Sequence, residues 1–277
     1  MCSADLKEFV EKYHLNLSQD GTFNPRDIFG SHDDSDHVYN TPRAWYMARC
    51  LNPSTMNWDG PDADFTPLSD DIPWCMVPEK KVTIEDVKYV LSSHFQGTPY
   101  DPYASYGDKS MKGAYRAIGV NRTDFLGIIQ MRPDAGEDNR AIEWVAFASN
   151  VFNTAAPFYT DVEKVPEYFS NTTGDASTDN FYWASRMIAA MADASYKSSI
   201  FHIERYQERV MSKGHQLIGK YDALLEKESD AAKRMSLRHQ ANQEIADMVK
   251  KEASDTLNKV LYELSNQMKN AYSRSDA

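Results

Sequence analysis

The sequence predicts an α+β fold with antiparallel strands and long C-terminal helices. Two observations lead to this prediction. Apolar runs rich in β-branched residues, separated by turn residues, occupy positions 116–149 and are typical of antiparallel strands. After Pro166 the apolar residues recur at intervals of three and four, which is the spacing of helices.

Three strands are predicted, at 117–120, 125–131 and 142–149, because the polar segments NRTD and RPDAGEDNRA separate three apolar runs. The second and third runs are almost continuously apolar. A strand with one face in water would alternate between apolar and polar residues instead. We therefore expect both faces of this sheet to be covered, as in a layered sandwich.

The helices are predicted from apolar spacing and from capping residues. Thr83 precedes two acidic residues, which predicts a helix N-cap there. The last two predicted helices form a hairpin around a polar break at 229–233. The predicted helices lie at about 6–14, 44–51, 82–95, 178–196, 200–224 and 245–268.

The composition excludes several classes of protein. The chain has 277 residues and a formal net charge of −11 without a basic stripe, so neither nucleic acid nor a membrane surface is an expected partner. No apolar run is long enough for a bilayer span and no signal segment opens the chain, so we expect a cytoplasmic protein. Three cysteines without a CxxC pair argue against a disulfide framework.

Two regions are expected along the chain. Residues 1–170 should form the α/β portion, and residues 171–277 should form a helical region that packs on it or extends from it. Within the first region, residues 21–78 are rich in Pro, Asp and Asn and also hold three tryptophans. Large aromatic side chains are costly to expose, so we expect an ordered loop near a functional site.

The densest polar cluster is the segment HDDSDHVYNTPRAW, residues 32–45. Histidine and carboxylate side chains suit zinc or another divalent ion, although the spacing does not match HExxH. A solvated, turn-forming acidic loop and a catalytic site without metal are the other interpretations. The metal-dependent hydrolase interpretation uses His32, Asp33, Asp36 and His37.

Arg43 is the most suggestive charged residue of this cluster, because it opens a short apolar helix that would fix its backbone. A guanidinium held in this way could bind a substrate carboxylate with two hydrogen bonds. A pairing with Asp36 or with a nearby carbonyl is the alternative. His94, which shares a second polar segment with Asp101, is interpreted as a helix C-cap, since it lies near Gly97.

The candidate nucleophiles are cysteines, because the sequence has no phosphate-binding loop and no serine elbow. Cys50 and Cys75 have apolar neighbours and are expected to be buried and inert. Cys2 would become the N-terminal residue if Met1 were removed, and its α-amino group could then deprotonate its own thiol. A chain end without a function is the alternative for Cys2.

Five motifs occur in one order along the chain and together resemble a known family. That family is the cysteine dipeptidases of peptidase D type, which are N-terminal-nucleophile hydrolases related to the secernins. The resemblance extends over nearly the whole chain and corresponds to the C-terminal portion of such enzymes. The motifs are HDDSDHVYNTPRAW, PWCMVPEKKVTIEDVKYVLSSHFQGTPYDPY, YRAIGVNRT, WVAFASNVFNTAAPFY and STDNFYWASRMIAAMAD.

The resemblance implies part of a four-layer αββα sandwich and a cysteine-type dipeptidase without metal or organic cofactor. Members begin with Cys-Thr-Thr, whereas Cys2 is followed by Ser-Ala, so the implied nucleophile is not in this chain. Arg43 matches an arginine that related amidases place near the nucleophile, which implies that it orients the thiolate or the substrate carboxylate. The implied substrate-binding residues are Asp36, Asn40 and His32.

Three partners are expected. Short peptides would be the substrates, and the upstream part of the same enzyme would have to be supplied for activity. A second copy is also expected, because a sheet that lacks neighbouring strands exposes edges that pair with other chains. A non-catalytic oligomerisation module is the remaining alternative, suggested by the acidic surface and the long C-terminal helices.

Overall fold

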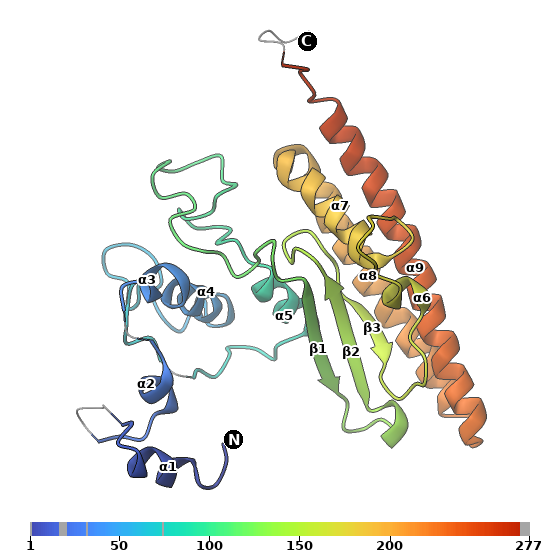
Figure 1. The fold of residues 1–277 in the computed structure, drawn as a ribbon, viewed down its shortest axis with the longest axis horizontal. Coiled ribbons are helices and arrows are strands. Elements are labelled where there is room, and N and C mark those ends of the chain that lie inside the picture. The colour runs from blue at the N-terminus through green and yellow to red at the C-terminus, as the bar shows by residue number, and fades with distance from the viewer. Residues whose placement is uncertain (1, 17–20, 32, 74, 272–277) are drawn as a thin grey trace.

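The fold is α+β, as predicted, in a computed structural model that describes residues 2–16, 21–31, 33–73 and 75–271. Figure 1 shows short helices and extended loops in the first half of the chain, followed by a sheet that packs on long helices. The helices are α1 (Leu6–Lys12), α2 (Pro25–Phe29), α3 (Asp36–Tyr39), α4 (Thr41–Leu51), α5 (Ile84–Leu91), α6 (Glu167–Ser170), α7 (Phe181–Ala194), α8 (Tyr196–Leu225) and α9 (Ala231–Ser265). The strands are β1 (Phe125–Met131), β2 (Ala141–Phe147) and β3 (Ala156–Tyr159).

The sheet is antiparallel in the order β1-β2-β3, with Phe125 opposite Phe147 and Ile142 opposite Tyr159. The predicted strands at 125–131 and 142–149 are confirmed. The predicted strand at 117–120 is wrong, because Gly119 donates its backbone N–H to Ser93 and packs against the end of α5. The third strand is instead β3. It is not predicted from the sequence because it contains Pro157, and proline is rare in strands.

One face of the sheet is open at β1 and half-buried at β2, so the expectation of two covered faces is wrong for these two strands, whereas both faces of β3 are buried. Side chains of β1 alternate between exposed and half-buried, and Ile129 is 68% exposed. Phe125 and Met131 lie exposed on the same face of β1. Among the described residues there is one sheet, so the second sheet of an αββα sandwich does not occur within these ranges.

The long helices confirm the predicted helical hairpin and explain its turn. Asp230 accepts a hydrogen bond from the backbone N–H of Lys233, and this cap starts α9 within the predicted polar break. Gly214 allows helix α8 to pack closely on β3. A Cβ at this position would lie only 2.7 Å from the side chain of Pro157. Within the described ranges no helix has an apolar stretch that could cross a bilayer.

Two clusters of buried side chains hold the fold together. The larger cluster joins the sheet to α7, α8 and α9 across the predicted boundary at residue 170, and that boundary stays a prediction. The smaller cluster lies under α4 and contains Trp45, Trp58 and Phe95. The expectation of ordered structure in residues 21–78 is therefore confirmed for Trp45 and Trp58, whereas Trp74 lies outside the described residues.

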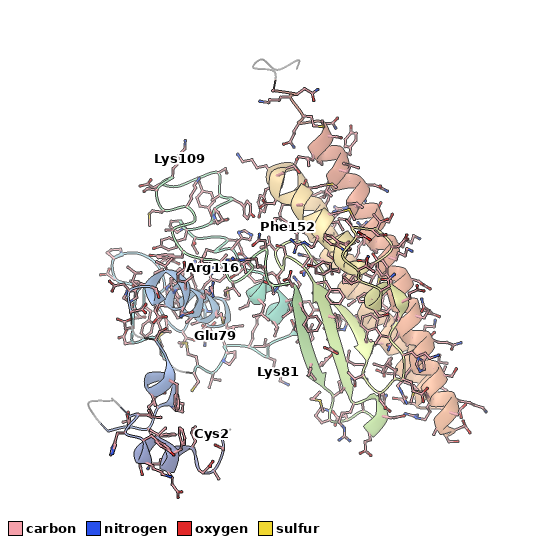
Figure 2. All side chains as sticks on the ribbon, viewed as in Figure 1. Cys2, Glu79, Lys81, Lys109, Arg116 and Phe152 are labelled. Atoms are coloured by element: carbon pink, nitrogen blue, oxygen red, sulfur yellow. The ribbon has the colours of Figure 1, made fainter. Side chains whose placement is uncertain are left out.

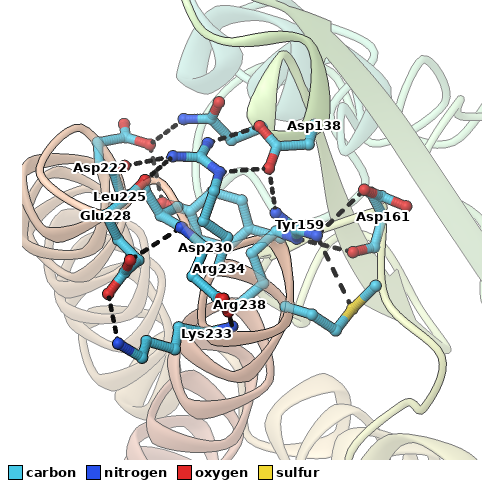
Figure 3. Close-up of polar contacts among 12 residues, drawn as sticks. Asp138, Tyr159, Asp161, Asp222, Leu225, Glu228, Asp230, Lys233, Arg234 and Arg238 are labelled. Atoms are coloured by element: carbon cyan, nitrogen blue, oxygen red, sulfur yellow. Dashed lines mark hydrogen bonds and ion pairs between the residues drawn. The ribbon is translucent and has the colours of Figure 1, made fainter.

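A network of ion pairs connects the β1–β2 loop to helix α9 (Figure 3). Asp138 accepts two hydrogen bonds from Arg234, at 2.6 and 2.7 Å, and one from Arg238 at 2.6 Å. Arg238 is only 3% exposed and also pairs with Asp161 at 3.1 Å. A buried guanidinium is costly without partners, so these carboxylates fix the loop on the helix.

We predict that Asp138→Asn lowers the free energy of unfolding at pH 7 by about 1.5–3 kcal/mol, the usual range for a hydrogen bond to a charged group. The hydrogen bonds from Arg234 and Arg238 lower the pKa of Asp138 from 3.8 to about 2. Because the folded pKa lies below the unfolded one, the carboxylate stabilises the fold above pH 4, and this contribution is lost as the pH falls towards 2.

Urea unfolding at a series of pH values measures this effect. The difference between the wild type and Asp138→Asn should shrink between pH 4 and pH 2. Asp134→Asn is the matched control, because Asp134 is exposed in the same loop. Equal loss of stability in both variants at pH 7 would contradict the assigned role of Asp138.

Candidate functional site

Helix α4 places Arg43 in its first turn and fixes the backbone there. Pro42 stands at the start of the helix, where its missing N–H costs nothing, and Trp45 is buried in the smaller core cluster. The Nε of Arg43 donates to the backbone carbonyl of Arg116 at 3.1 Å. Arg43 was expected to pair either with Asp36 or with a nearby carbonyl if it did not bind substrate, and the structure shows the hydrogen bond to a carbonyl.

Arg116 reaches the same place from a distant part of the chain. Its backbone N–H donates to the carbonyl of Val38 at 3.0 Å, and its guanidinium lies 5.3 Å from the centre of the Tyr39 ring. Figure 2 shows Arg116 in the region of α4. Helices α3 and α4 and the segment before β1 therefore meet at one site.

The two arginines form a cationic pair that suits an anionic ligand. Burial and the neighbouring Arg116 lower the pKa of Arg43, since a second positive charge disfavours the guanidinium. Neither Arg43 nor Arg116 forms an ion pair with a carboxylate in the part of the chain that the structure describes. A planar carboxylate is the ligand that guanidinium groups bind best, with two parallel hydrogen bonds.

Asp36 and Asn40 lie together at a neighbouring cavity of 640 Å³. Asp36 accepts hydrogen bonds from the hydroxyl of Ser31 at 2.9 Å and from the side chain of Asn40. Arg43 does not line this cavity, because its side chain is directed to Arg116. The structure thus brings Asp36 and Asn40 together and separates them from the arginine pair, while His32 lies outside the described residues.

The described members of the proposed metal-binding set have other partners. His37 contacts Asp70 at 2.9 Å, and Asp33 accepts the backbone N–H of Ser35 at 2.9 Å. Among the residues that the structure describes, no three histidine, cysteine or acidic side chains are grouped so that they could hold a metal ion.

Among the described residues, no hydrogen bond or ion pair joins any of the three cysteines to Arg43 or Arg116. Cys75 is exposed, so its predicted burial is wrong. Cys50 is half-buried on α4, and burial raises the pKa of its thiol, which favours the unreactive protonated form. Cys2 is exposed next to α1, and Figure 2 shows it well apart from Arg116.

His94 is part of a buried polar group, and its expected role as a C-cap is wrong. Its Nδ1 contacts a carboxylate oxygen of Asp101 at 2.9 Å, and its Nε2 lies 3.3 Å from the hydroxyl of Tyr196. Helix α5 ends three residues earlier, at Leu91, so His94 is too far along the chain to cap it. Both His94 and Tyr196 line a cavity of 760 Å³ between α5 and α8.

Lys88 lines the same cavity and was missed by the sequence analysis. It is 4% exposed, and its Nζ donates to the hydroxyl of Ser92 and to the carbonyl of Asn150, the latter at 2.8 Å. Burial lowers the pKa of Lys88 to about 7. The available signal was its position four residues after Ile84, on the apolar side of α5.

Lys88 should make stability depend on pH in a defined direction. Its folded pKa lies below the unfolded value, so the unfolded chain binds one more proton between pH 7 and pH 10, and stability rises with pH in that range. We predict that Lys88→Met is more stable than the wild type at pH 6 and that this advantage declines towards pH 10.

Urea unfolding of both proteins across this pH range is the measurement. Lys81→Met is the matched control, since Lys81 is exposed just before α5 (Figure 2), and it should not change the slope. A slope that Lys88→Met leaves unchanged would contradict the burial of a titrating Lys88.

Comparisons with known proteins identify relatives of the chain. Residues 1–209 match the model of peptidase family C69. The chain is 47% identical to a dipeptidase of Bifidobacterium longum over 315 positions and 44% identical to a probable dipeptidase A of Streptococcus pyogenes over 277. It is also 32% identical to a probable dipeptidase B of Lactococcus lactis over 280. Each alignment covers 100% of this chain but only 56–59% of the relative.

Proposed function

The chain belongs to peptidase family C69, and from this premise we propose that it is part of a cysteine-type dipeptidase in which Arg43 and Arg116 bind the substrate's carboxylate. One observation carries the proposal. Arg43 and Arg116 are half-buried, and the charge of Arg116 is close enough to lower the pKa of Arg43. Neither has a carboxylate partner among the described residues. The free carboxylate of a dipeptide is an anion of the right chemistry for this pair.

We propose that the thiol nucleophile is supplied by a segment that corresponds to the part of the relatives outside the alignment with this chain. Cys50 is the cysteine on the same helix as Arg43, and burial raises the pKa of its thiol, while no contact joins Cys2 or Cys75 to the arginines among the described residues. The chain spans less than three-fifths of its relatives' length, which leaves room for such a segment. The open, apolar face of β1 supports contact with further chain, because Ile129 and Met131 would otherwise stay in water.

The proposed reaction follows the chemistry of an N-terminal thiol. The thiolate attacks the peptide carbonyl, while the α-amine of the same residue accepts the thiol proton and passes it to the leaving amine. The C-terminal amino acid leaves as the amine, and water then hydrolyses the resulting thioester, which releases the N-terminal amino acid and regenerates the thiol. Arg43 and Arg116 hold the carboxylate of the leaving amino acid and so fix the scissile bond, whereas Asp36 and Asn40 stay candidates for contacts to the rest of the substrate.

The test measures dipeptide hydrolysis by this chain alone and after its co-expression with the part of the Bifidobacterium longum dipeptidase that lies outside the alignment. We expect activity only from the combination, and complete loss of activity after thiol alkylation. Cys2→Ala should leave the activity of the combination unchanged. Alkylation-sensitive activity of this chain alone, lost in Cys2→Ala, would instead assign the nucleophile to Cys2.

We predict that Arg43→Met lowers kcat/KM for a dipeptide about 10–100-fold, the effect of losing a hydrogen bond to a charged group. Hydrolysis of the corresponding dipeptide amide, which lacks the carboxylate, should change little. Arg116→Met should behave in the same way. The measurement is the ratio of kcat/KM for acid and amide in each variant of the combined enzyme.

Arg122→Met is the matched control, because Arg122 is exposed in the segment that follows Arg116. It should keep the preference for the acid. Equal losses for acid and amide in Arg43→Met would mean that the arginine acts elsewhere than on the substrate carboxylate.

We also propose that the protein is cytoplasmic and that it associates with a second copy of itself.

A further inference from the structure

The cavity between α5 and α8 lies apart from the arginine pair and has no role in the proposed reaction. Its volume of 760 Å³ is within the range of about 300–1,000 Å³ that is typical of small-molecule sites. Its lining includes one buried cation, two acidic side chains on α8 and an apolar wall. Each of these three parts matches one part of an amino acid.

Lys88 is the cation, and one of its three N–H donors has no hydrogen-bond acceptor among the described residues. The ammonium has three N–H donors, and two of them go to Ser92 and to the carbonyl of Asn150. No carboxylate in the described parts of the chain lies within ion-pair distance of Lys88. A ligand carboxylate in the cavity would accept the third hydrogen bond and would also compensate the buried charge.

Glu204 and Glu208 supply the opposite charge, one helical turn apart on α8. Neither has an ion-pair partner within the described residues. An ammonium group is the ligand that such a pair of carboxylates favours. Val151, Ile200 and Met211 line the same cavity and offer apolar surface to an aliphatic side chain.

We propose that this cavity binds a free aliphatic amino acid, with its carboxylate on Lys88, its ammonium on Glu204 and Glu208, and its side chain on the apolar wall. The choice of an amino acid rests on the proposed function, because hydrolysis of a dipeptide releases amino acids. The occupancy of this site would then depend on the concentration of the product, at a place outside the arginine pair.

Binding should be coupled to uptake of a proton. Burial places the pKa of Lys88 at about 7, so the amine is mostly neutral at pH 8, and a bound carboxylate favours the ammonium. Other ionisable groups line the cavity, and the control variants must separate them from Lys88. Those in the described lining are Glu85 with His215, His94 with Asp101 behind it, Tyr89 and Tyr196.

The test is isothermal titration calorimetry of the 277-residue chain at pH 8, in two buffers that differ in ionisation enthalpy. The ligands are L-leucine, 4-methylpentanoate, which lacks the amine, and 3-methylbutylamine, which lacks the carboxylate. We expect leucine to bind with proton uptake and each analogue to bind at least about tenfold more weakly, since each loses a charge-assisted contact.

The variants assign the two ends of the ligand. Lys88→Gln should weaken leucine about tenfold, abolish proton uptake and remove the preference for leucine over the amine. The double variant E204Q/E208Q should remove the preference over the acid. Lys81→Gln is the control and should bind like the wild type, and circular dichroism checks that each variant is folded.

Two results would overturn the proposal. One is a folded wild-type chain that does not bind leucine, and the other is leucine binding that Lys88→Gln leaves unchanged. The titration needs no hydrolysis, so it is independent of the proposed dipeptidase activity. If the combined enzyme is active but the 277-residue chain does not bind leucine, only the proposed amino-acid site is refuted. If the chain binds leucine but the combined enzyme has no dipeptidase activity, only the proposed function is refuted.

Discussion

The pairing of the buried Arg238 with carboxylates is the constraint on which the rest of the fold depends. A guanidinium that is 3% exposed must be neutralised by its surroundings, and Asp138 and Asp161 do this from just before β2 and just after β3, at the same end of the sheet. These ion pairs hold the start of β2 and the end of β3 against α9. Helix α8 packs on α9 and also carries one wall of the α5–α8 cavity.

The elements that the sequence predicts correctly are those with a local physical signature. Thr83 and Asp86 form a reciprocal cap at α5, and the apolar spacing at 200–224 and 245–268 falls largely within α8 and α9, although α9 begins 14 residues before the spacing does. The errors come from tertiary contacts. Gly119 leaves the strand pattern because it packs on α5, and β1 is nearly continuous in apolar residues although one of its faces is open.

The candidate site shows the same division. Arg43 could be selected from the sequence, because a cation at the start of an apolar helix is a recognisable arrangement. Its neighbour Arg116 could not, since no local pattern joins residues 73 positions apart. Lys88 was missed because lysine is expected in water, and only the packing of α8 over α5 reveals that its ammonium is enclosed.

The hydrogen bond from Arg43 to the carbonyl of Arg116 has a consequence for the order of assembly. The β1–β2 pair and the α8–α9 hairpin consist of contacts between neighbours in the chain, which form fast. Closing a 73-residue loop costs more conformational entropy than either of these hairpins does. The anion-binding pair is therefore a late product of folding, and it is among the first features lost when the first half of the chain opens while the helical hairpin persists.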